Sequence, residues 1–120
     1  MAKLKAHGEE ITRFFSPSKR SLMAVMSDGV TLKRNLYSGW KVAATKKSDV
    51  SLETWKRGKL EKITQVIPQW ARNVEHIPSL ATLQAWEADG ICETPTGYRV
   101  EPDGHGPDGS PSWLLALGII

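Results

Sequence analysis

The dipeptide Asp28-Gly29 constrains the fold of this chain most strongly, because it lies between two β-prone runs, residues 21–27 and 30–34. Asp-Gly favours a tight hairpin turn, since both central residues of a type I′ turn adopt positive φ angles. A two-residue loop predicts two facing pairs across this hairpin: Val25 with Leu32 and Met23 with Arg34. The fold is therefore expected to contain an antiparallel hairpin at these residues.

Two more β-prone runs flank this hairpin. Residues 11–15 precede it and end at the turn sequence 16–18, and residues 40–45 follow a break at Ser38-Gly39. Four short strands in succession predict a small antiparallel meander, which needs a helix over one face to be stable.

Helical patterns follow the predicted strands. Ser51 is a suitable N-cap for a helix from residue 52 to residue 67, in which apolar side chains recur at helical spacing. Pro68 ends that helix and favours a short second one over residues 69–74. A third helix, residues 80–89, is predicted between a Ser79 cap and Gly90, the type of residue that accepts the left-handed exit conformation.

The last thirty residues combine turns with short regular elements. Residues 91–94 and 98–101 flank Pro95-Thr96-Gly97 and predict a second hairpin. A loop rich in Pro, Asp and Gly covers residues 102–109. A final short helix is predicted over residues 113–117, with its N-cap provided by Ser110-Pro111-Ser112.

Together these patterns predict an α+β fold in one domain, residues 1–120. A small N-terminal antiparallel β-meander packs on helices and is followed by a helix plus β-hairpin unit. Residues 1–10 are expected to be a flexible lead-in, residues 11–75 a sheet and helix part, and residues 76–120 a helix and hairpin part.

Charge is distributed unevenly between these parts. Residues 1–75 contain fifteen basic and seven acidic residues, a net charge of +8, whereas residues 76–120 contain one basic and six acidic residues, a net charge of −5. Such a field steers partners of opposite charge. The basic part is suited to phosphates, and the acidic part is suited to a basic protein surface or to the chain's own basic part.

Several functional classes are disfavoured by the sequence. The one cysteine, Cys92, excludes an intrachain disulfide, and the chain is expected to reside in the reducing cytoplasm. No run approaches the ~18 apolar residues of a membrane span. Neither a catalytic signature nor a phosphate-binding glycine loop occurs, so we expect no enzyme activity and no cofactor.

The loop at residues 102–109 carries three possible metal ligands: Asp103, His105 and Asp108. Oxygen ligands on a glycine-rich loop can hold Ca²⁺, but the EF-hand spacing and its terminal glutamate are missing. Asp-Gly after proline is also ordinary turn chemistry. We expect no metal site here, and the sequence leaves open whether these three residues bind anything.

Residues 82–91, followed by Gly97-Tyr98-Arg99, carry a family resemblance. Thr82-Leu83 begins a helix, Trp86-Glu87 and Gly90-Ile91 end it, and Gly97-Tyr98-Arg99 closes a hairpin. Residues 67–101 thereby resemble the winged-helix region of MerR-type and excisionase-like DNA-binding proteins. The resemblance implies a base contact by Gln84 and a phosphate contact by Arg99.

The predicted recognition helix itself carries Glu87 and Asp89 and no cation. Phosphate neutralisation dominates affinity for DNA, so the basic part must supply most contacts. The residues expected to do so are Arg13, Lys19, Arg20, Lys33, Arg34, Lys56, Arg57, Lys59 and Lys62.

The leading functional prediction is therefore a small non-enzymatic regulator or accessory protein that binds double-stranded DNA. The alternative is an inhibitor or adaptor module that binds a basic protein through its acidic, Trp-bearing half. The contact residues expected for the alternative are Trp40, Glu87, Asp89 and Trp113. Among the other tryptophans, Trp55 and Trp86 are expected in the core, because they share a helix face with neighbouring apolar residues.

Overall fold

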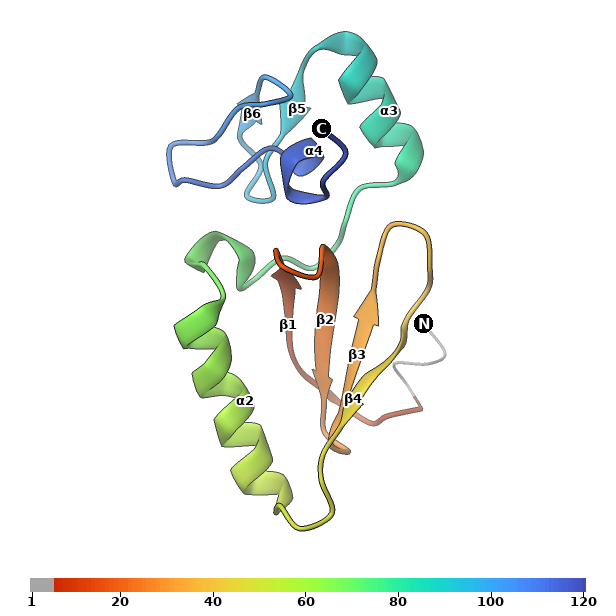
Figure 1. Ribbon diagram of the computed structural model, residues 1–120, viewed down its shortest axis with the longest axis vertical. Helices are drawn as coiled ribbons and strands as arrows, with labels where there is room; N and C mark the ends of the chain where they lie inside the picture. Colours follow the sequence, from red (N-terminus) through yellow and green to blue (C-terminus); the bar gives the residue numbers. More distant parts are fainter. Residues whose placement is uncertain (1–5) are drawn as a thin grey trace.

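A four-stranded antiparallel sheet forms the N-terminal half of the protein. The computed structural model describes residues 6–120. The strands are β1 (Glu10–Ser16), β2 (Ser21–Met26), β3 (Val30–Arg34) and β4 (Lys41–Thr45), and they lie in the order β1-β2-β3-β4 (Figure 1). This is the predicted meander, in which each strand pairs with its neighbour in sequence.

The register of the central hairpin differs from the predicted one. Val25 faces Thr31 and Met23 faces Lys33, one residue away from the expected partners. The loop contains three residues, closed by a hydrogen bond from the Gly29 amide to the Met26 carbonyl (3.2 Å), with Gly29 at φ 93°. A type I turn followed by a left-handed glycine is the usual three-residue hairpin loop. One left-handed glycine suits both loop types, and the longer loop moves the register by one residue.

Helix α2 (Leu52–Val66) lies beside the sheet (Figure 1). Its predicted cap is confirmed: the Ser51 hydroxyl accepts a hydrogen bond from the Thr54 amide (3.2 Å). None of the fifteen residues of α2, all of which are described, is buried. An amphipathic helix usually buries one stripe of side chains, so α2 packs unusually lightly against the sheet.

A 3-10 turn, η1 (Gln69–Ala71), follows α2 and is shorter than the predicted helix over residues 69–74. Pro68 precedes this turn as its N-cap rather than forming its first residue. The chain then leads into the C-terminal module, which we define as residues 79–120.

The C-terminal module contains α3 (Leu80–Asp89), the paired strands β5 (Cys92–Glu93) and β6 (Arg99–Val100), and α4 (Trp113–Ala116). Both helix caps are as predicted, because the hydroxyls of Ser79 and Ser112 accept amide hydrogen bonds. Gly90 ends α3 at φ 70°. The predicted helix plus hairpin order is confirmed, and the winged-helix resemblance remains a prediction.

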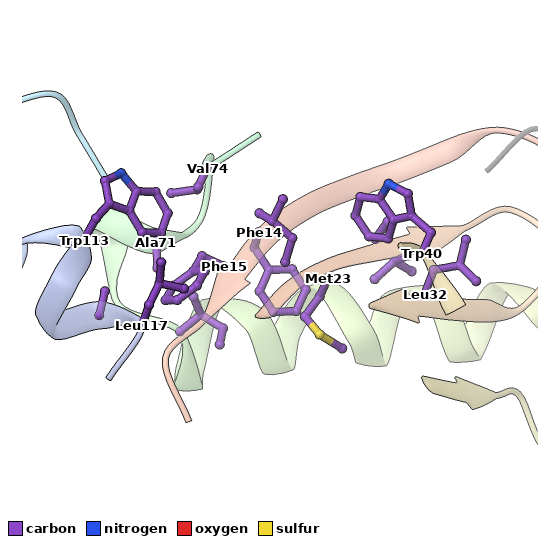
Figure 2. Packing of buried hydrophobic residues seen from close by; sticks show 14 of the residues in the cluster. Phe14, Phe15, Met23, Leu32, Trp40, Ala71, Val74, Trp113 and Leu117 are labelled. Carbon is purple, nitrogen blue, oxygen red and sulfur yellow. The ribbon is translucent and has the colours of Figure 1, made fainter. Parts of the chain in front are cut away.

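An aromatic contact joins the sheet to the C-terminal module. Phe15 of β1 is fully buried, and its ring meets Trp113 edge-on with a centroid distance of 5.2 Å. The ring of Trp70 lies 6.3 Å from Phe15. Figure 2 shows a row of buried side chains running from Trp113 through Phe15 and Phe14 toward Trp40. One hydrophobic cluster therefore spans both halves of the molecule.

Candidate functional site

The basic residues of the N-terminal half do not all lie on one surface. Lys56, Arg57 and Lys62 are exposed on α2, and Lys59 of the same helix is half-buried. The turn between β1 and β2 adds the exposed side chains of Lys19 and Arg20. The sequence thus places a group of cations on α2 and on this turn.

Three of these amines converge, and we call Lys19, Lys59 and Lys62 the lysine cluster. All three line the same cleft. Burial lowers the pKa of Lys59, and the charges of Lys62 and Lys19 lower it further. Among residues 6–120, none of the three forms an ion pair with a carboxylate. The cluster is therefore an uncompensated positive patch.

The cleft beneath the lysine cluster lies between α2 and one face of the sheet. It has a volume of ≈ 300 Å³. Its apolar lining includes Phe14, Met23, Val25, Ile63, Val66 and Ile67. The sequence predictions did not include this cleft. One sequence signal could have indicated the cleft. Lysines and apolar residues share one side of α2 and its C-cap, at positions 59, 62, 63, 66 and 67.

One polar side chain in the cleft wall has no partner. Thr31 lines the cleft, is 4% exposed, and its hydroxyl has no hydrogen-bond partner in the described part of the chain. Leaving a buried hydroxyl unpaired costs about 1–3 kcal/mol. The sheet wall of the cleft therefore contains one buried, unsatisfied hydroxyl.

Arg13 has a structural position in place of the phosphate contact expected from the sequence. Its guanidinium forms an ion pair with Glu10 (2.6 Å) and donates a hydrogen bond to the Glu75 carbonyl (2.8 Å). It also lies 5.1 Å from the ring centroid of Trp40, within cation–π range. These contacts tie β1 to the segment after η1 and leave Arg13 poorly placed to meet a ligand.

The other predicted basic residues divide between two places. Lys33 and Arg34 are half-buried on β3, where Lys33 faces Met23 and Arg34 faces Leu22. Because successive strand residues point to opposite faces, these two charges emerge on different sides of the sheet. The Arg20 guanidinium lies against Gly118 of the C-terminal module. None of these three residues lines the cleft of the lysine cluster.

The α3 helix and the β5–β6 hairpin form an acidic surface. Gln84, Glu87 and Asp89 are exposed on α3. Arg99 is exposed on β6, directly opposite Glu93, and Asp89 lines the same hollow. In Figure 1, α3 lies at the other end of the molecule from the first turns of α2. Neither Gln84 nor Arg99 lines the cleft of the lysine cluster, and Arg99 shares its own hollow with Asp89 and Glu93.

Two of the four contact residues expected for the protein-binding alternative are buried. Trp40 is 7% exposed and Trp113 is 5% exposed, whereas Trp55 and Trp86 are only partly buried. Trp40 and Trp113 therefore offer little surface to a partner, while Trp55 and Trp86 pack against the core as expected but remain partly exposed. Trp40 contacts Arg13 and Trp113 contacts Phe15, and neither long-range contact follows from helix periodicity.

The loop at residues 102–109 is organised by hydrogen bonds. The carboxylate of Asp108 accepts hydrogen bonds from the hydroxyl of Thr96 (2.7 Å) and from the amide of Ser110 (3.1 Å). Hydrogen bonds from the Ser110 and Thr96 side chains lower the pKa of Asp108. No group of three or more metal-ligating side chains occurs within residues 6–120. Asp108 therefore serves to fix the loop.

Comparison with known proteins returns no match to a family model, a curated protein or a solved structure. No helix in the described residues is both long enough and apolar enough to cross a bilayer.

Proposed function

We propose that this chain binds nucleic acid, with double-stranded DNA as the leading partner, through a basic surface on α2 and the β1–β2 turn. We define this basic surface as Lys19, Lys56, Arg57, Lys59 and Lys62. The observation that carries the proposal is the convergence of Lys19, Lys59 and Lys62 without a carboxylate partner among the described residues.

The electrostatics of the cluster support this assignment. Like charges placed close together repel one another, and Lys59 also loses hydration through burial. A phosphate group that approaches the cluster relieves this repulsion and releases counterions from the nucleic acid. Because phosphate contacts carry no sequence information, this surface alone supplies affinity rather than specificity.

The proposal assigns the main contacts to residues other than those of the winged-helix resemblance. Glu87 and Asp89 are exposed on α3 and repel phosphates. A base contact by Gln84 and a phosphate contact by Arg99 remain predictions of the resemblance. Substituting these two residues is a separate test, and the proposed basic surface does not depend on its outcome.

The deciding experiment is a fluorescence titration of the full chain with a random duplex of about 20 base pairs, at ~50 and ~200 mM salt. The test variant is the double substitution Lys56→Glu and Lys62→Glu. The matched control is Lys41→Glu with Lys47→Glu, which makes the same charge change at exposed sites on β4 and in the loop before α2.

We expect salt-dependent binding whose log–log slope falls by about two in the test variant, since each phosphate contact contributes about 0.9. The control should retain most of the slope. A third variant, Lys33→Glu with Arg34→Glu, asks whether the sheet also contributes, and its binding should weaken less than that of the test variant. Absence of binding at low salt, or equal losses in test and control, would overturn the proposal.

A further inference from the structure

The cleft between α2 and the sheet has an apolar lining, unfilled space and lysines without carboxylate partners among the described residues, and these three features point to a small ligand. α2 forms one wall, while Phe14, Met23 and Val25 on the sheet form the opposite one. α2 buries none of its residues, although its sequence is apolar on this side, and Val66 at the cleft remains 64% exposed. The space between helix and sheet is therefore apolar but incompletely filled by the protein.

The cleft also has polar residues in its lining. Lys19, Lys59 and Lys62 line it without carboxylate partners in the described residues. Thr31, in the sheet wall, holds the buried hydroxyl that lacks a hydrogen-bond partner. Ligand pockets commonly show this composition, with an apolar lining and a few convergent polar groups that fix orientation.

We propose that this cleft binds a free organic anion with an apolar body, such as an alkyl carboxylate of about eight carbons. The apolar body lies between α2 and the sheet, and the carboxylate lies at the lysine cluster. The proposal concerns a small-molecule site and does not rest on nucleic-acid binding.

Charge and size select this class of ligand. Three amines without counter-charges favour an anion over a neutral or cationic molecule of the same shape. At roughly 30 Å³ for a water-sized group, the ≈ 300 Å³ cleft holds about ten non-hydrogen atoms. Octanoate has this size. The apolar walls add affinity in proportion to the area that the ligand removes from water.

The test is calorimetric titration of the full chain, without nucleic acid, using octanoate, octanol and octylamine as probes. We expect saturable binding of octanoate at millimolar concentration, weaker binding of octanol and none of octylamine. Equal binding of all three would show a hydrophobic surface without anion selection and would overturn the proposal. Absence of saturable octanoate binding would overturn it as well.

Variants locate the site. Lys59→Met keeps an unbranched apolar side chain but removes the charge, and it should weaken octanoate binding at least about tenfold. Lys56→Met is the matched control, because Lys56 lies on the same helix but does not line the cleft, and its affinity should be unchanged. Equal losses in these two variants would refute the assignment.

A further variant keeps the test independent of folding. Ala44→Leu enlarges an exposed side chain that lines the cleft, and it should block octanoate while circular dichroism remains native. Native affinity in a folded Ala44→Leu protein would place the ligand elsewhere and refute the proposal.

Discussion

The edge-on contact between Phe15 and Trp113 allows a quantitative test of how the two halves of the molecule are held together. The two ring centroids are 5.2 Å apart with an interplanar angle of 86°, and both side chains are buried. Such aromatic pairs contribute about 0.5–1.5 kcal/mol beyond the area that they bury. We therefore predict a coupling free energy of this size between positions 15 and 113.

The perturbation is a double-mutant cycle of Phe15→Leu and Trp113→Leu. Phe15→Leu keeps most of the apolar volume and should cost about 1.5 kcal/mol. Trp113→Leu leaves a larger void and should cost about 2–3 kcal/mol. Because total stability is typically about 5–15 kcal/mol, leucine is preferable to alanine at both positions. The two losses together should exceed the loss in the double variant, since the aromatic contact can be removed only once.

Urea unfolding followed by circular dichroism measures each free energy of unfolding, and an unchanged dependence on urea shows that the folded states are comparable. The control cycle pairs Trp113→Leu with Trp40→Leu, because these two side chains lie at opposite ends of the buried row in Figure 2. The control losses should add within about 0.5 kcal/mol. Additive losses for Phe15 and Trp113 would refute the idea that their contact couples sheet and module.

Three further predictions concern the C-terminal module. Hydrogen bonds from Ser110 and Thr96 lower the pKa of Asp108 from its ordinary value of 3.8. The stability that these bonds add to the folded protein is therefore present above pH 3.8, and it is lost as the pH falls through the lower pKa of the folded state. Urea midpoints measured against pH should show this loss in the native protein and a flatter acid profile in Asp108→Asn; identical profiles would contradict the assignment. Ser79→Ala removes the hydrogen bond accepted from the Thr82 amide and should lower the free energy of unfolding by about 1 kcal/mol, whereas Ser79→Asp should retain it, and equal effects would exclude a capping role. Gly106→Ala would bring a methyl group to 2.9 Å from the Tyr98 ring and should cost about 1–3 kcal/mol, while Gly39→Ala, which enters open space, should not lower the thermal midpoint.

Features that depend on neighbouring residues were predictable from the sequence. The caps at Ser51, Ser79 and Ser112 each use one hydroxyl to accept an amide hydrogen bond three residues later. Gly90 occupies the left-handed position that ends α3. Each of these caps depends only on residues within about one helical turn, so residue type and spacing are sufficient to predict it.

The hairpin register shows where local information becomes insufficient. A left-handed Gly29 fits both a two-residue and a three-residue loop. In the three-residue loop, the Gly29 carbonyl accepts a hydrogen bond from the amide of Lys46 (2.8 Å), a residue that follows β4 in the sequence. The turn dipeptide alone cannot encode a contact with residue 46.

The candidate site is formed by residues that are even further apart in the sequence. Lys19 and Lys59 are forty positions apart, and their proximity results from the way α2 returns along the sheet. The buried side chains of Trp40 and Trp113 contact Arg13 and Phe15 respectively, again across long separations in sequence. Charge counting identified the basic half of the chain, but it could not show that Arg13 is held by Glu10 and Glu75.

The order of the strands also has a consequence for how quickly the protein folds. Every neighbouring pair in the four-stranded sheet is consecutive in sequence, so only short loops must close before the meander forms. The contact of Phe15 with Trp113 closes a much longer loop, and it is supported only when the C-terminal module already has its shape. We expect the rate-limiting barrier to involve the β2–β3 hairpin, with φ-values there well above those at Trp113. Docking of the module would then mainly slow unfolding, so that the contact joining the two halves sets the lifetime of the native state more than the speed of its formation.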